Sequence, residues 1–188
     1  MRNINRGFIL MFLLISIFSM SSCIVKDKRS VGNIIDDQVI ATKILHELAK
    51  NSTKNSLTNV SANVCEGRVL LTYYVTDVRF KDKAESIAWL VWGVKEVIND
   101  IVVAEKNEAN TVKDLWIKTK LKTKFLVDEE IHSVNYQATV YKGIVYLLGI
   151  AESQKELNKV LKIASGIEGV SKVKNYVVIK NDIRRNTN

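Results

Sequence analysis

The chain contains the same pattern of residues twice, and this repeat constrains its fold more than any other feature. Eight residues recur in order at a constant offset of 76 positions: Gly67, Val69, Leu71, Ala88, Gly93, Val94, Val97 and Asn99 are matched by Gly143, Val145, Leu147, Ala164, Gly169, Val170, Val173 and Asn175. Upstream, Ile40, Ile44 and Leu48 recur at an offset of 77 as Ile117, Leu121 and Phe125. A duplicated folding unit explains both offsets. Because the copies share one scaffold, we expect functional chemistry where they differ.

Each copy predicts a helix followed by two strands. The helix is indicated by the three upstream apolar positions, which are spaced four residues apart and therefore line one helical face. Thr111 and Asp114 form a capping-box pattern, which predicts that the helix of the second copy begins near residue 112. The strands are predicted at residues 57–65 and 69–76, and again at residues 134–141 and 144–150. Between the strands, Gly67 and Gly143 are typical of tight hairpin turns with a positive φ.

A second helix then returns the chain to the sheet. Apolar residues at core spacing predict this helix around residues 84–91 and 160–167, and Gly93 and Gly169 are predicted to end it. A last strand is predicted at residues 97–103 and 173–179. Because this strand arrives through a helix, it can pair in parallel with a hairpin strand. The predicted fold class is therefore α+β, with two αββαβ units that each form a three-stranded mixed sheet covered on one face by two helices.

These patterns resemble the BON domain, a family found in tandem in bacterial envelope proteins. The resemblance rests on an ordered set that occurs twice: an Ile-x-x-x-Ile type of helix, a Gly-x-Val-x-Leu strand, an alanine-rich helix and a Gly-Val-x-x-Val segment. It covers about residues 36–104 and 110–180. The first copy departs from the family pattern at Tyr73, where the second copy has the expected Gly149. This departure argues against a first-copy site that needs close backbone approach at that position.

The start of the chain is predicted to be a lipoprotein signal peptide. Arg2 and Arg6 precede an apolar run at residues 8–20, and two small serines lie directly before Cys23. The run is shorter than the about 20 residues that a membrane-spanning helix needs. By resemblance to bacterial lipoproteins, the chain is cut before Cys23, which then receives the lipid. An ordinary secretory signal is the alternative.

The signal peptide also predicts the compartment and the domain organisation. Ile24 rather than Asp follows the cysteine, which favours the outer membrane by analogy with enteric sorting rules. Once Cys23 is acylated, Cys65 is the remaining thiol, either packed beside its hairpin or reactive. The predicted parts are a signal peptide at 1–22, a tether at 23–35, a first BON-like domain at 36–104, a linker at 105–109, a second BON-like domain at 110–180 and a tail at 181–188.

Composition and motifs exclude several classes of function. Without Arg2 and Arg6, 26 basic residues remain against 20 acidic residues, which favours anionic partners. Nucleic acid is not expected, because the chain is predicted to be exported and carries no familiar nucleic-acid-binding motif. His46 and His132 are the only histidines, and neither belongs to a catalytic motif or to metal-ligand spacing. We therefore expect no enzyme activity, no metal site and no cofactor.

The two copies differ most in the charge of their first helix. The second copy carries Lys113, Lys118, Lys120, Lys122 and Lys124 against one acid, Asp114, whereas the first has Asp36, Asp37 and Glu47 with Lys43 and His46. At about 100° per residue, Trp116 lies roughly 140° from the centre of the core-facing residues and so faces outward. Lys120 lies on one side of this outward strip and Lys122 on the other. This arrangement suits an interfacial helix whose indole lies among lipid headgroups.

We therefore predict an anionic phospholipid site on the first helix of the second copy. Its members are Trp116, Lys113, Lys120, Lys122 and Lys124. The resemblance favours this prediction, because in dual-BON, division-associated outer-membrane lipoproteins this helix binds anionic phospholipid and carries a tryptophan at the place of Trp116. The alternative is that Trp116, with Val112 and Leu115, packs against the first copy or against a second molecule.

The function predicted is that of a lipid-anchored, non-catalytic envelope protein that binds anionic phospholipid and supports outer-membrane integrity. The rival prediction is a periplasmic adaptor that binds an acidic protein or a cell-wall polymer. Other envelope proteins are possible partners of the first domain. Trp89 and Trp92, near the end of the second helix of the first copy, are expected to pack in the core or between the domains, with a partner groove as the alternative.

Overall fold

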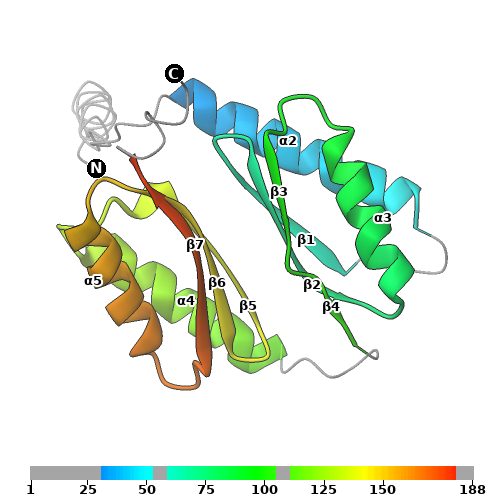
Figure 1. The fold of residues 1–188 in the computed structure, drawn as a ribbon. Coiled ribbons are helices and arrows are strands. Elements are labelled where there is room, and N and C mark those ends of the chain that lie inside the picture. The colour runs from blue at the N-terminus through cyan, green and yellow to red at the C-terminus, as the bar shows by residue number, and fades with distance from the viewer. Residues whose placement is uncertain (1–30, 53–58, 105–110, 181–188) are drawn as a thin grey trace, which may run out of the picture.

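The computed structural model describes residues 31–52, 59–104 and 111–180 (Figure 1). The first domain contains α2 (Val31–Lys50), β1 (Val60–Cys65), β2 (Arg68–Val75), α3 (Val78–Trp89), β3 (Glu96–Asn99) and β4 (Val102–Val103). The second contains α4 (Thr111–Val127), a 3₁₀ turn (Ser133–Asn135), β5 (Tyr136–Tyr141), β6 (Ile144–Ala151), α5 (Gln154–Ser165) and β7 (Lys172–Ile179). The predicted signal peptide, Cys23, the linker and the tail lie outside the described residues.

Each domain has the predicted α+β architecture. In the first domain β1 and β2 form an antiparallel hairpin, and β3 pairs with β2 in parallel. In the second domain β5 and β6 form the hairpin, and β7 pairs with β6 in parallel. In the first sheet Val69 pairs with Val64 on one side and Val97 on the other, and Val145 occupies the matching place in the second sheet. Two helices cover one face of each sheet (Figure 1). The αββαβ order predicted from the repeat is confirmed.

The last strand of the first domain is interrupted, which the sequence pattern did not predict. β3 ends at Asn99 and β4 begins at Val102, whereas β7 runs unbroken over the matching positions. The interruption lies opposite Tyr73, whose φ of 75° takes β2 out of the extended conformation. The second domain has Gly149 there, and a Cβ at this glycine would overlap the backbone oxygen of Asn135. Glycine is therefore needed where β5 approaches β6 closely, and Tyr73 shows that the first domain is built differently.

Both second helices end earlier than predicted. α3 ends at Trp89 and α5 at Ser165, so Gly93 and Gly169 lie four residues past the helices rather than at their ends. Both glycines have a positive φ, 93° and 82°, in the turn that leads into the last strand. That turn packs against the first helix of its own domain, because a Cβ at Gly93 would lie 2.9 Å from Ile40 Cδ1. The glycines therefore allow the turn to lie close to the first helix.

Other boundaries also shift. α2 begins at Val31, within the segment that the sequence predicted as a tether at 23–35. β5 begins at Tyr136, because the preceding residues form the 3₁₀ turn. The carboxylate of Asp114 accepts hydrogen bonds from the backbone N–H groups of Lys142 and Gly143, both at 2.8 Å. It thereby ties α4 to its hairpin.

The two sheets pack on each other through the faces that the helices leave uncovered. A buried interdomain cluster joins Cys65 and Leu70 of the first domain to Tyr141, Tyr146, Leu148 and Ile150 of the second. Cys65 is fully buried there, which favours the packing interpretation of this thiol over the reactive one. With the helices outside, the molecule has four layers in the order helix, sheet, sheet, helix (Figure 1).

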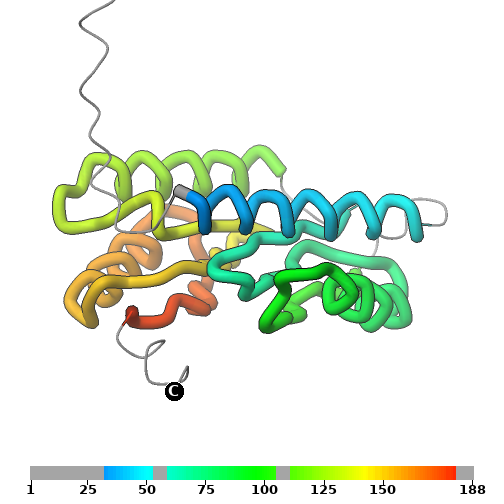
Figure 2. The backbone as a smooth tube through the Cα atoms, turned by 90° about the horizontal axis from the view of Figure 1, so that it is seen from above, coloured from blue at the N-terminus to red at the C-terminus, as the bar shows by residue number. Residues whose placement is uncertain are grey.

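Equivalent residues of the two copies meet across this interface. Asn63 Nδ2 donates to Thr139 Oγ1 at 2.6 Å, and the Tyr176 hydroxyl donates to Asp100. Each of these pairs joins positions that are 76 residues apart, so the two domains are related by an approximate twofold rotation. As a result α2 and α4 lie along one side of the molecule and α3 and α5 along the other (Figure 2). The first helices of both domains therefore face the same way.

Candidate functional site

The outer face of α4 is an exposed apolar strip. On the inner face Ile117, Leu121 and Phe125 are buried in the core of the second domain, as the spacing predicted. On the outer face the indole of Trp116 is 43% exposed, so this ring is not enclosed by the neighbouring domain. The other exposed apolar residues of the strip are Val112, Leu115, Leu126 and Val127. We call this set, together with Trp116, the α4 strip.

Two threonines also lie on the α4 strip, and their hydroxyls are already hydrogen-bonded within the helix. The Thr119 hydroxyl donates to the backbone oxygen of Leu115 at 2.9 Å, and the Thr123 hydroxyl donates to that of Thr119 at 3.0 Å. Because these hydroxyls are already bonded within the helix, moving them out of water leaves no donor without a partner. The outer face of α4 can therefore enter a less polar medium without a large desolvation penalty.

Lysines border the α4 strip on both sides. At about 100° per residue, Lys113, Lys120 and Lys124 fall on one border and Lys118 and Lys122 on the other, and all five are exposed. Lys120 Nζ lies 5.7 Å from the centroid of the Trp116 ring, within range of a cation–π contact. The structure thus places the predicted tryptophan and the predicted lysines on one surface. Their role in binding is not tested by this geometry and stays a prediction.

A depression lies beside the first turn of α4. It has a volume of about 560 Å³ and is lined by Val112, Lys113 and Trp116 from the helix and by Glu168 and Gly169 from the turn before β7. A Cβ at Gly169 would lie 2.5 Å from Lys113 Cε, so the glycine makes room for the lysine stem. Sequence reasoning missed Glu168 and Gly169, although the close approach of this turn to the first helix follows from the repeated glycine.

Comparison with known proteins identifies the family. The BON domain model matches residues 36–105 and 113–181, which is most of the chain. The chain belongs to the BON domain family. The chain is 42% identical over 149 residues to an uncharacterized protein in the gshII 5′ region of Anaplasma centrale, a match that covers 78% of this chain and 96% of that protein.

Two further relatives of this BON-domain chain carry descriptive names. The outer membrane lipoprotein DolP of Haemophilus influenzae is 33% identical over 156 residues, covering 82% of this chain and 80% of that protein. The osmotically-inducible protein Y of Escherichia coli is 28% identical over 155 residues, covering 81% of this chain and 77% of that protein.

The first BON domain lacks the basic border that the second has. In α2, Ile35 and Val39 occupy the places of Val112 and Trp116 and are likewise exposed. At the α2 positions that match the five lysines of α4, however, only Lys43 is a lysine. The other four positions hold Asp36, Ala41, Leu45 and Glu47. The first helices of the two BON domains therefore share an exposed apolar strip but differ in charge.

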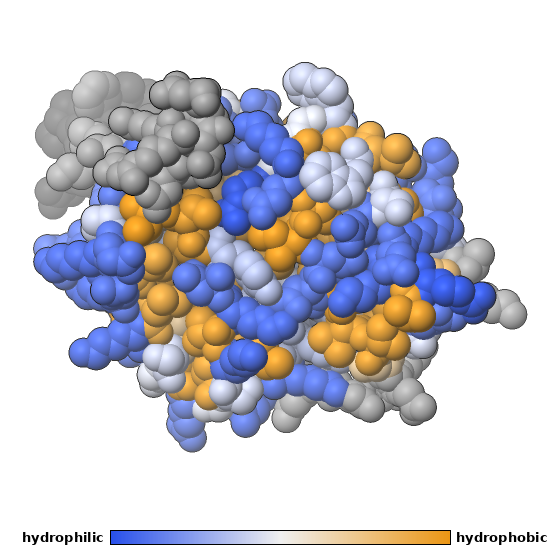
Figure 3. Space-filling model, in the orientation of Figure 1, coloured by the Kyte–Doolittle hydropathy of each residue, from blue (hydrophilic) through white to orange (hydrophobic). Residues whose placement is uncertain are grey.

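The prediction that Trp89 and Trp92 pack in the core or between the domains is wrong. Trp89 is 50% exposed and Trp92 is 89% exposed, and Leu90 between them is also exposed. The reason is the early end of α3, after which Val91 is the residue of the turn that reaches the core. Figure 3 shows apolar and pale side chains gathered near the top of the view, over the end of α3 and the turn that follows.

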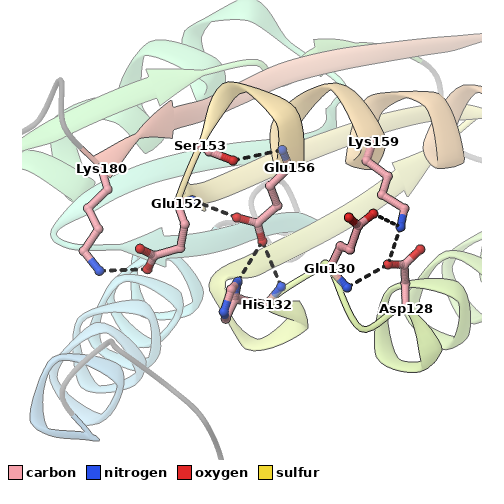
Figure 4. Close-up of polar contacts among 8 residues, drawn as sticks. All are labelled: Asp128, Glu130, His132, Glu152, Ser153, Glu156, Lys159 and Lys180. Atoms are coloured by element: carbon pink, nitrogen blue, oxygen red, sulfur yellow. Dashed lines mark hydrogen bonds and ion pairs between the residues drawn. The ribbon is translucent and has the colours of Figure 1, made fainter.

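The end of α4 is held in place by a polar cluster on α5 (Figure 4). Lys159 Nζ lies 2.7 Å from Asp128 Oδ1 and 2.6 Å from Glu130 Oε2. Hydrogen bonds from Lys155 and then Lys159 lower the pKa of Glu130 to about 2. The buried Glu156 accepts from the backbone N–H of His132 at 2.8 Å and lies 3.2 Å from His132 Nδ1. These contacts tie the segment that follows α4 to α5.

The described residues contain neither a cluster suited to a metal ion nor a membrane-spanning helix. Among residues 31–52, 59–104 and 111–180, no three His, Cys, Asp or Glu side chains are grouped as a metal ion would require. No helix in these same ranges has the length and apolar character to cross a membrane. The α4 strip with its lysines is therefore the best-defined candidate site in the described part of the chain.

Proposed function

We propose that this BON-domain protein is a non-catalytic component of the bacterial envelope, anchored by a lipid on Cys23, that binds anionic phospholipid through the α4 strip. The observation that carries the proposal is the exposed indole of Trp116 on a helix face bordered by lysines. The relative named outer membrane lipoprotein DolP supports the outer membrane as the location. There the two domains would face the periplasm and support the integrity of the membrane.

The lipid anchor and the α4 strip would act together. The anchor keeps the α4 strip near the bilayer and so raises the effective concentration of lipid at the strip, and a basic patch is a common companion of such anchors. A lysine near an anionic surface contributes about 1 kcal/mol, so three lysines contribute about 3 kcal/mol, or roughly 100-fold in affinity. The indole adds apolar burial at the depth of the headgroups.

The charges are not uniform along α4, and this decides which lysines matter most. Glu168 places one acid at the depression that Lys113 also lines. We therefore assign the attraction for anionic headgroups mainly to Lys120, Lys122 and Lys124, which lie further along the helix. Lys113, whose stem rests against the turn at Gly169, would position the first turn of α4 rather than supply most of the attraction.

Flotation of vesicles tests this proposal. A chain that begins at Ile24 keeps both domains and removes the anchor, so the contribution of α4 can be measured alone. We expect this chain to float with phosphatidylglycerol vesicles and not with phosphatidylcholine vesicles, and binding to weaken as salt is added. Trp116→Ala should reduce flotation several-fold, whereas Val78→Ala, which removes an exposed apolar side chain at the start of α3, should not.

Two results would overturn the proposal. One is flotation that is the same with both kinds of vesicle or that is unaffected by Trp116→Ala. The other is absence of binding to either vesicle together with a protein recovered by crosslinking at position 116, which would favour the adaptor that binds an acidic protein.

A further inference from the structure

The first BON domain has its own exposed apolar patch, which the proposed function does not use. It is formed by Ile35 and Val39 on α2 and by Leu90 and Trp92 in the turn after α3, and we call it the first-domain patch. All four side chains are exposed, and Trp92 is the most exposed of the three tryptophans. Such a concentration of large apolar side chains in water is typical of a contact surface.

The repeat shows that three of these residues, Ile35, Val39 and Trp92, belong to one place, and Leu90 lies two residues before Trp92. In the second domain, Val112, Trp116 and Glu168 line a single depression. Their counterparts in the first domain are Ile35, Val39 and Trp92. The turn that carries Trp92 packs against α2 in the first domain too, because Gly93 approaches Ile40. Where the second domain has the acidic Glu168, the first domain therefore has a tryptophan beside two exposed aliphatic side chains.

The position of the predicted lipid anchor indicates what covers this patch. Cys23 is eight residues before Val31, where α2 begins. Eight residues span at most about 28 Å even when fully extended. Ile35 lies about 6 Å further along the helix, at about 1.5 Å per residue. A lipid on Cys23 would therefore keep the first-domain patch close to the bilayer at all times, which raises the effective concentration of lipid at the patch.

The approximate twofold rotation makes the two surfaces compatible with one membrane. It places α2 and α4 along the same side of the molecule (Figure 2). The sequence between Cys23 and α2 also contains Lys26, Lys28 and Arg29 against one acid, Asp27, so the charge of this segment suits an anionic surface. A bilayer explains the anchor, the apolar patch and this charge together, whereas a protein partner explains the patch alone.

We propose that the first BON domain makes a second contact with the same bilayer, through Ile35, Val39, Leu90 and Trp92. This inference rests on the proposed function for the anchor at Cys23. It adds that the protein lies on the membrane through both domains, with Trp92 in the contact of the first domain and Trp116 in the contact of the second. The first domain is then a membrane contact rather than a spacer.

Depth-dependent quenching by brominated lipid tests the contact. The Cys65 thiol is fully buried and therefore protected from a maleimide. A chain that begins at Cys23 can thus be coupled to a maleimide lipid through Cys23 alone. The vesicles contain phosphatidylglycerol and phosphatidylcholine, with or without bromine in the acyl chains. One variant keeps Trp92 as its sole tryptophan through Trp89→Phe and Trp116→Phe. A matched control carries Val78→Trp with all three natural tryptophans changed to phenylalanine.

We expect bromine to reduce the emission of Trp92 roughly twofold, because interfacial side chains reach the acyl boundary. The Val78→Trp control should be nearly unchanged, since it lies at the other end of α3. Equal emission of Trp92 in brominated and unbrominated vesicles would overturn the inference, and a protein then captured by a crosslinker at position 92 would identify the patch as a docking site instead. Because the anchor is supplied chemically, this result does not depend on natural lipidation of Cys23. A separate variant with Trp116 as its sole tryptophan reports on α4.

Discussion

At the residue scale, equivalent positions of the two copies have been adapted to different uses. Position 73 holds a tyrosine with a positive φ, while its counterpart Gly149 allows β5 to approach β6. Val39 and Trp116 occupy matching places on exposed helix faces, but the tryptophan has Lys120 against its ring. These differences arise from single side chains on a scaffold that the two domains share, apart from the interrupted last strand of the first.

The close approach at Gly149 gives a stability prediction. Gly149→Ala would place a Cβ against the backbone oxygen of Asn135, which cannot move without shifting β5, so we expect a loss of about 1 to 3 kcal/mol in the free energy of unfolding. Gly166→Ala is the milder comparison, because its Cβ would lie 3.2 Å from the Lys162 backbone oxygen, a tight contact without the overlap at Gly149, and its φ of −85° suits alanine. Urea denaturation measures both. Equal stability of the two variants would show that β5 does not pack on β6 as described.

At the scale of elements, the repeat predicted the order of helices and strands and the buried faces of α2 and α4. Those features follow from periodicity, which a sequence displays directly. The early ends of α3 and α5 could not be predicted, because they depend on how the following turn packs against the first helix. The exposure of Trp92 follows from the same cause. The outward direction of Trp116 was predictable from helical geometry, whereas the depression that includes Glu168 required the tertiary structure.

The lysine borders of α4 give a prediction about binding. Lys120→Glu combined with Lys122→Glu should weaken binding to phosphatidylglycerol vesicles by at least about tenfold, since each lysine contributes about 1 kcal/mol near an anionic surface. The dependence of affinity on salt should become shallower at the same time. Lys162→Glu, an exposed position on α5 along the opposite side, should reduce affinity much less. A similar loss in both variants would indicate that net charge, and not the α4 strip, governs binding.

At the scale of the whole molecule, the two domains share a core and form a single body. Cys65 and Leu70 from the first sheet are buried against tyrosines and aliphatic residues of the second. The approximate twofold rotation across this interface brings both first helices to one side. An anchored molecule can therefore present the α4 strip and the first-domain patch to one membrane together. The interface is thus part of the proposed mechanism as well as of the stability.

This shared core predicts cooperative unfolding. Leu70→Ala removes a fully buried side chain from the interdomain cluster, so we expect the whole protein to lose about 2 to 5 kcal/mol of stability. Labelling of Cys65 by a maleimide and loss of helical circular dichroism should follow the same transition in urea, before and after this substitution, in a chain that begins at Ile24. Labelling of Cys65 at urea concentrations that leave the helices intact would show that the domains separate before they unfold.

The central claim, that the indole of α4 enters the headgroup region of an anionic membrane, is tested most directly by the emission of Trp116. A chain that begins at Ile24 and carries Trp89→Phe and Trp92→Phe has Trp116 as its sole tryptophan. On titration with phosphatidylglycerol vesicles its emission should shift to shorter wavelength and return when salt is added, with no shift on phosphatidylcholine vesicles. An emission maximum that stays at its value in water throughout the titration would contradict the proposed function.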